Sequence, residues 1–111
     1  MAAIDASNKT FDALINTDFA VADFHAYHCG GCVALAPFYN AQSNDLPLIN
    51  YIKVNTDDYP EIAERHQVTG LPTLIYFRNG REVFREGGYM ERDRLDQNIA
   101  RLLYGKEEEH G

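Results

Sequence analysis

The sequence predicts an α/β domain in which helices alternate with short strands. Its 111 residues are the length of one domain, and 45% of them are hydrophobic. Apolar segments of strand length also alternate with segments of helical periodicity. We therefore expect residues 1–105 to fold as one domain around a single core. Residues 106–111 include three successive glutamates, and we expect them to form a frayed acidic tail.

The first half of the domain is predicted to hold two strands and two helices, beginning with a short strand near Ile4. The helix that follows has an apolar face at spacings of three and four, formed by Phe11, Leu14 and Ile15. Residues 19–24 are apolar apart from Asp23, which is typical of a strand buried on both faces. A second helix begins near Cys32 and is expected to be kinked by Pro37, which removes a backbone donor. Its expected apolar stripe consists of Val33, Leu35, Ala36, Phe38 and Tyr39.

The second half is predicted to hold a strand, a helix, a hairpin and a final helix. Residues 48–55 form the expected third strand, and the helix after it runs through Gln67. Residues 73–77 and 82–86 are expected to pair, because the Asn-Gly dipeptide at 79–80 is a strong hairpin signal. The last helix has an apolar face formed by Leu95, Ile99, Leu102 and Leu103. The predicted order is therefore βαβαββα with a βα extension at its N-terminus.

The charge and the hydropathy of the chain bear on its partners. Ten Lys and Arg residues against seventeen Asp and Glu residues give a net charge of −7, which phosphate backbones would repel. No apolar run approaches the roughly 18 residues of a membrane-spanning helix. Residues 1–14 also lack the basic start and apolar stretch of a secretory signal. We expect a cytoplasmic protein that binds neither nucleic acid nor membrane.

The two cysteines, Cys29 and Cys32, form a C-x-x-C motif between a predicted strand and a predicted helix. A disulfide across so short a loop stabilises folding by only roughly 2 kcal/mol, which makes a structural role a poor explanation. A zinc site needs three or four ligands, and only His25 and His28 stand close enough in sequence to complete one. The motif favours redox chemistry and leaves a metal site open.

Beyond this motif, the chain resembles the thioredoxin family from about Phe11 to Leu103. The features that carry the resemblance are a buried strand with Asp23, the C-x-x-C motif at a helix start, Pro37 five residues after the second cysteine, Thr69-Gly70-Leu71-Pro72-Thr73 before a strand, the Asn79-Gly80 hairpin, and Gly88. The resemblance implies the thioredoxin fold, which is a central mixed β-sheet flanked by helices. It also implies a cis peptide bond between Leu71 and Pro72, beside the cysteines.

The resemblance implies a protein dithiol–disulfide oxidoreductase that reduces protein disulfides and serves electron transport and cell redox homeostasis. Cys29 would be the nucleophile, because a helix start favours its thiolate. Cys32 would resolve the mixed disulfide, and the two would form the redox-active disulfide. Asp23 would accept the proton of Cys32, with Lys53 nearby to tune its pKa. The alternative for Asp23 and Lys53 is a purely structural pair.

The resemblance also implies a rim on which the backbone of a substrate docks. The residues expected there are His28, Gly30, Gly31, Gly70, Leu71, Pro72 and Gly88. The expected partners are disulfide-containing proteins and a reductase, and the chain is expected to act as a monomer. No bound cofactor or metal is implied, since electrons would come from an NADPH-dependent reductase or a small thiol. His66 and His110 are predicted to be surface residues.

Two departures from the family pattern lie at this site. The chain has no tryptophan, and His25 and His28 stand where the family usually carries two before the motif. Gly31 replaces the usual proline between the cysteines, which restores a backbone N–H. A reductase would bind this same rim, so the resemblance does not imply recognition by the family's usual NADPH-dependent reductase. A thiol oxidase or isomerase with a more oxidising potential stays open, as does a non-catalytic interaction module, although both cysteines and Asp23 count against the latter.

Overall fold

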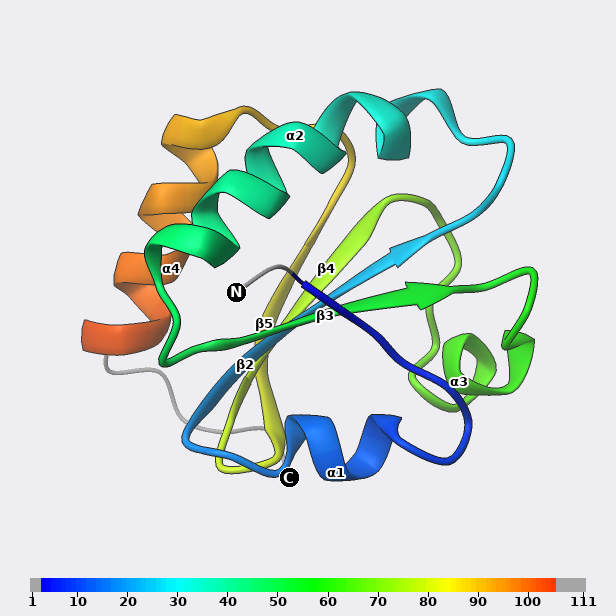
Figure 1. Cartoon of the computed structure of the whole chain (residues 1–111), viewed down its shortest axis with the longest axis horizontal. Coiled ribbons are helices and arrows are strands. Elements are labelled where there is room, and N and C mark those ends of the chain that lie inside the picture. Colours follow the sequence, from blue (N-terminus) through cyan, green and yellow to red (C-terminus); the bar gives the residue numbers. More distant parts are fainter. Residues whose placement is uncertain (1–2, 106–111) are drawn as a thin grey trace.

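The computed structural model describes residues 3–105 and shows a five-stranded sheet with helices on both faces (Figure 1). Its elements are β1 (Ile4–Asp5), α1 (Phe11–Ile15), β2 (Phe19–His25), α2 (Gly30–Asp45), β3 (Asn50–Asn55), α3 (Pro60–Arg65), β4 (Thr73–Arg78), β5 (Arg81–Gly87) and α4 (Arg92–Tyr104). The predicted α/β class and order of elements are confirmed. The tail expected at 106–111, with His110, lies outside the described residues.

The sheet is mixed, and β2 lies at its centre in the order β1-β3-β2-β4-β5. It pairs in parallel with β3 and antiparallel with β4. The second strand of the hairpin, β5, follows a turn in which Asn79 and Gly80 both have positive φ, as a two-residue type I′ turn requires. Having neighbours on both sides, β2 is buried from Ala20 to Phe24, as its apolar sequence predicts.

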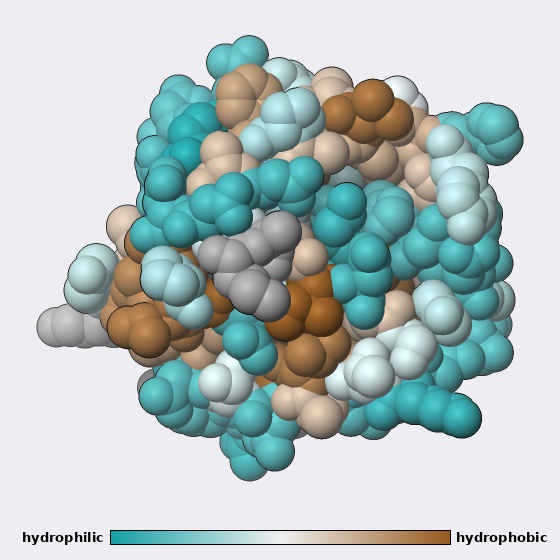
Figure 2. All heavy atoms as spheres, in the orientation of Figure 1, coloured by the Kyte–Doolittle hydropathy of each residue, from teal (hydrophilic) through white to brown (hydrophobic). Residues whose placement is uncertain are grey.

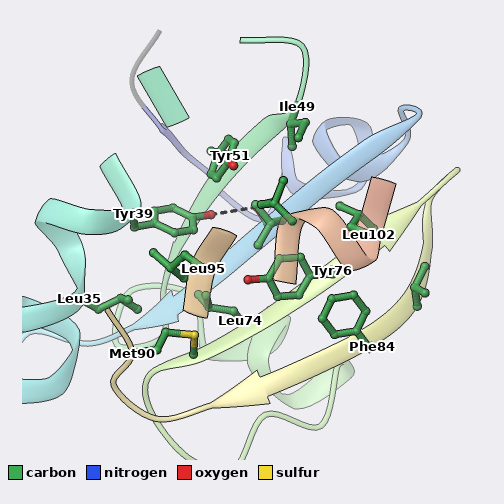
Figure 3. Packing of buried hydrophobic residues seen from close by; sticks show 13 residues of the cluster. Leu35, Tyr39, Ile49, Tyr51, Leu74, Tyr76, Phe84, Met90, Leu95 and Leu102 are labelled. Atoms are coloured by element: carbon green, nitrogen blue, oxygen red, sulfur yellow. Dashed lines mark hydrogen bonds between the residues drawn. The ribbon is translucent and has the colours of Figure 1, made fainter. Parts of the chain in front are cut away.

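Helices cover the two faces of the sheet in pairs, with α2 and α4 on one face and α1 and α3 on the other (Figure 1). The first face packs a cluster that includes Val21, Leu35, Tyr39, Tyr76, Leu95 and Leu102 (Figure 3). The second includes Phe11, Phe24, Ile52, Ile75 and Phe77. Since alternate residues of a strand share a face, Asp23 and His25 project with Val21 towards α2.

Helix α2 buries one narrow stripe against the sheet. The buried members are Cys32, Leu35, Tyr39, Gln42 and Ser43, at spacings of mainly three and four. The hydroxyl of Tyr39 lies 3.0 Å from the carbonyl oxygen of Val21 and 2.8 Å from that of Ile52, so it anchors the helix to β2 and β3. Val33 was expected in this stripe and is instead 68% exposed, because it lies about 100° around the helix from Cys32.

Two predicted boundaries were wrong by two residues. Strand β3 begins at Asn50 instead of residue 48, and Leu48 is almost fully exposed in the preceding turn. Helix α3 ends at Arg65 rather than Gln67. Gln67 has a φ of 56°, and the amide of Val68 donates to the carbonyl of Ala63, which is a Schellman-type ending.

This helix ending also explains why the prediction for His66 was wrong. The chain turns back at Gln67, and the His66 ring packs 5.2 Å from the Phe11 ring and 6.0 Å from the Phe77 ring. His66 is therefore half-buried, and burial lowers the pKa of its imidazole.

The described residues include no helix long and apolar enough to cross a membrane. The face of the molecule in Figure 2 is mostly hydrophilic, with hydrophobic patches between the polar side chains. An apolar groove of about 400 Å³, lined in part by Phe19 and Leu48, lies at the end of β2 away from the cysteines.

We predict that Tyr39→Phe destabilises the fold by about 1–2 kcal/mol, because it removes the hydroxyl that bridges two buried carbonyl groups. Urea unfolding of the two proteins measures the difference. Tyr104→Phe is the matched control, since the Tyr104 side chain is exposed at the end of α4. A loss of the same size in both variants would contradict the anchoring role of Tyr39.

Candidate functional site

The two cysteines lie at the start of α2 and form a disulfide, with their Cα atoms 5.2 Å apart. Cys29 is the N-cap residue of the helix, and its Sγ accepts a hydrogen bond of 3.2 Å from the backbone N–H of Cys32. Cys29 is partly exposed, whereas Cys32 is 5% exposed and faces the sheet. A helix N-terminus favours negative charge, so the structure places Cys29 where a thiolate is both stabilised and accessible.

The loop before β4 lies directly against the first turn of α2. Its Leu71–Pro72 peptide bond is cis, which confirms that expectation. A Cβ added to Gly31 would lie 3.2 Å from Cδ of Pro72, so this glycine allows the two segments to approach closely. The backbone N–H of Gly88 donates to the carbonyl of Pro72 at 2.8 Å, and Gly88 has a φ of 95°. Gly31, Pro72 and Gly88 are thus brought together beside the disulfide.

The other predicted rim residues flank these three along the chain. His28 and Gly30 adjoin Cys29 and are exposed. Gly70 and Leu71 precede Pro72, and both are exposed. The carbonyl of Gly70 accepts a hydrogen bond of 2.6 Å from the Thr73 hydroxyl, which holds the loop in its turn.

Two exposed tyrosines next to rim residues in the chain were not predicted from the sequence. Tyr89 is 47% exposed, and its Cβ would lie 4.0 Å from a Cβ on Gly31. Tyr27 is 62% exposed, and its hydroxyl donates to the carboxylate of Asp58 at 2.7 Å. Each follows or precedes a predicted rim residue in sequence, and that adjacency was the available signal. The rim is more aromatic than expected.

Beneath the disulfide lies a cavity of about 140 Å³. It is lined by Asp23, His25, Ala26, Cys32, Val33, Ala36 and Lys53. The Asp23 side chain is 1% exposed, and its Oδ1 atom has no hydrogen-bond partner. Burial raises the pKa of this carboxyl from 3.8 to about 7, and the nearby charge of Lys53 limits the rise.

Lys53 is the cross-strand neighbour of Asp23 in β3. The five ion pairs between described residues do not include one between these two side chains. The sequence-predicted pair is therefore adjacent without being joined directly. Lys53 acts on Asp23 through its charge.

His25 ends β2 on the same face as Asp23 and is partly buried. Its Nε2 atom is buried and has no hydrogen-bond partner. Burial is the main cause that lowers the pKa of this imidazole, and Lys53 adds to the effect. Within residues 3–105, no three His, Cys, Asp or Glu side chains are grouped to hold a metal ion.

Comparison with known proteins gives consistent matches. The thioredoxin family model matches residues 2–101. Thioredoxin of Chlamydia trachomatis is 36% identical over 95 residues, covering 86% of this chain and 93% of that protein. Thioredoxin of Chlamydia caviae is 37% identical over 89 residues, covering 80% and 87%. The structure of Plasmodium falciparum thioredoxin matches with a TM-score of 0.83 and 31% identity, covering 88% of this chain and 97% of that one. The predicted thioredoxin fold is confirmed.

We predict that alanine has different effects at the two adjacent glycines of α2. Gly30→Ala should gain up to about 1 kcal/mol of stability, because alanine favours a helix and no atom lies within 4 Å of the new Cβ. Gly31→Ala should be about 1 kcal/mol less stable than Gly30→Ala, because its Cβ crowds Pro72. Urea unfolding of both variants measures this, and equal stabilities would contradict the close packing at Gly31.

We also predict that Asp23→Asn stabilises the protein by an amount that grows with pH. The folded pKa of about 7 lies above the unfolded value of 3.8, so the native Asp23 holds a proton that the unfolded chain has lost between these values. Wild-type stability therefore falls from about pH 4 to about pH 7, by up to about 4 kcal/mol from this group. Unfolding of both proteins across this range tests the prediction. A difference that does not vary with pH would contradict it.

Proposed function

The chain belongs to the thioredoxin family and reduces protein disulfides, and we propose that Cys29 starts this reaction and Cys32 completes it. The observation that carries the assignment is the contrast between the two sulfurs. Cys29 is accessible and caps the helix with an N–H on its Sγ atom, whereas Cys32 is buried against the sheet. The disulfide in the structure is the oxidised form of the pair.

The reaction begins from the dithiol form. The Cys29 thiolate attacks one sulfur of the substrate disulfide and forms a mixed disulfide, and the other substrate sulfur leaves as a thiolate. The Cys32 sulfur then loses its proton and attacks Cys29, which releases the second substrate sulfur. Two electrons pass from the cysteine pair to the substrate. Because Cys32 is three residues from Cys29, this second attack is intramolecular and fast.

Asp23 accepts the proton of Cys32 in this scheme. Both side chains line the same cavity, and a carboxyl with a pKa of about 7 is poised to accept a proton near neutral pH. Lys53 tunes Asp23, since its positive charge opposes the effect of burial. Without Lys53 the carboxyl would stay protonated at higher pH and could not serve as the acceptor.

The rim beside the disulfide binds an extended segment of the substrate. Its surface is formed largely by backbone and consists of His28, Gly30, Gly31, Gly70, Leu71, Pro72 and Gly88. The space beside Gly30, which has no side chain, lets a substrate backbone approach the Cys29 sulfur closely. Tyr27 and Tyr89 add exposed rings that bind apolar side chains of the substrate.

The electron source and the setting follow from this chemistry. A dithiol that acts as a reductant has to be kept reduced, so we place it in a reducing compartment, the cytoplasm. An NADPH-dependent reductase or a small thiol returns it to the dithiol form. The chain itself supplies every group that the reaction uses, so it acts as a monomer.

Two alternatives concern the same disulfide. The family and the disulfide motif support reduction, which leaves the non-catalytic interaction module without support. Oxidase or isomerase activity differs from reduction in the potential of the pair. The sequence predicts that Gly31 and His28 make the reduction potential of the cysteine pair more oxidising, and this stays a prediction.

We predict that the two cysteine variants fail at different steps. Cys32→Ser should attack a disulfide substrate once and remain joined to it through Cys29, because nothing resolves the mixed disulfide. Cys29→Ser should form no adduct, because its remaining thiol is 5% exposed in the wild-type structure. Intact-protein mass spectrometry after incubation with the substrate distinguishes these results. An adduct on Cys32 in the Cys29→Ser protein would reverse the assigned roles.

A further inference from the structure

We propose that His25 carries the proton between Asp23 and solvent when Cys32 resolves the mixed disulfide. The inference rests on the proposed role of Asp23 as the acceptor. Asp23 is 1% exposed, so a proton that it takes from Cys32 and does not return to that thiol reaches solvent only through groups or water beside it. A second group beside it that exchanges protons near neutral pH would serve that purpose.

The position of His25 fits this task. Asp23 and His25 are two residues apart on β2, so their Cα atoms lie about 7 Å apart and their side chains share a face. Both line the cavity of about 140 Å³ that also includes Cys32. A neighbouring cavity of about 350 Å³ lies between β1, β3 and the loops that follow β2 and β3. Only His25 and Lys53, among the described residues, line both cavities.

Two residues that line the cavity of about 140 Å³ have unpartnered polar atoms that complement one another. Oδ1 of Asp23 and Nε2 of His25 are both buried without a hydrogen-bond partner. A water molecule occupies about 30 Å³ in the liquid, so the cavity has room to bridge the two groups through water. The ammonium of Lys53 has no lone pair and cannot accept a proton. His25 is therefore the group on this wall that can receive a proton from Asp23.

Opposing effects act on the proton affinity of His25. Burial and Lys53 of β3 lower the pKa of the imidazole, whereas Asp5 of β1 and the carboxylates of Asp57 and Asp58 raise it. The net shift is downward from 6.5, so His25 is neutral near pH 7 and free to accept. The pKa of Asp23 is raised to about 7.

Each proton and each bond of the resolution step has a defined destination. The Cys32 thiol gives its proton to the Asp23 carboxylate, and its sulfur forms a bond to the Cys29 sulfur. The bond between Cys29 and the substrate sulfur breaks, and the substrate leaves as a thiolate that takes a proton from solvent. Asp23 passes its proton through water in the cavity of about 140 Å³ to His25, which releases it to solvent in the cavity of about 350 Å³.

The test is to measure the rates of the first attack and of resolution in single-turnover experiments. The reduced protein reacts with a disulfide substrate at values from about pH 5 to about pH 9. His25→Gln keeps a polar side chain but has no basic nitrogen. It should slow resolution about tenfold at neutral pH and change the pH profile, while the first attack by Cys29 is unaffected. His66→Gln is the matched control, because it removes another half-buried imidazole with an unpartnered Nε2, placed away from the site. The control should resolve at the wild-type rate.

A second variant separates proton transfer from packing. In His25→Ala, added imidazole should restore resolution, whereas pyrrole, a ring of the same size without the basic nitrogen, should not. Resolution by His25→Gln at the wild-type rate, or equal rescue by both rings, would overturn the relay. If His25→Gln is normal and Asp23→Asn is slow, the relay fails and the acceptor stands. If Asp23→Asn resolves normally, the acceptor assignment fails and the relay with it.

Discussion

The burial of the Asp23 carboxyl away from bulk solvent is the constraint on which this site depends. The carboxyl lies on the central strand, with β3 on one side, β4 on the other and α2 above it. Desolvation disfavours its charged form, and the adjacent Lys53 offsets only part of that effect. The fold thereby gives up stability at neutral pH and gains a carboxyl that exchanges a proton there. Structural cost and chemical function arise from the same burial.

Helix α2 couples that burial to the sulfur chemistry. Its N-terminal turn leaves Cys29 partly exposed, and its sheet-facing stripe places Cys32 in the same cavity as Asp23. The Tyr39 hydroxyl ties the same helix to the carbonyls of two strands, below the cysteines. The position of Cys32 relative to Asp23 is thus set by the packing of α2 on the sheet as well as by the short C-x-x-C loop.

The sequence predicts most of this architecture because the relevant signals are local. Hydrophobic periodicity and the Asn-Gly turn identify the elements, and the C-x-x-C motif identifies the reactive pair. Features that depend on contacts between distant segments could not be predicted from these local signals. His66 is half-buried because a left-handed turn at Gln67 folds its ring onto two phenylalanines. Val33 is apolar yet exposed, because only one face of α2 meets the sheet.

The same distinction applies within the site. The cis bond before Pro72 came from resemblance, since no local pattern specifies that isomer. The sequence shows His25 only as a replacement for the family's tryptophan, because its place between two cavities depends on β1 and β3 as well as on its own strand. An indole N–H donates a hydrogen bond and does not accept a proton near neutral pH. An imidazole at that position therefore adds a titratable group to a wall that also holds Asp23, and in the proposed relay this group passes on a proton that tryptophan could not accept.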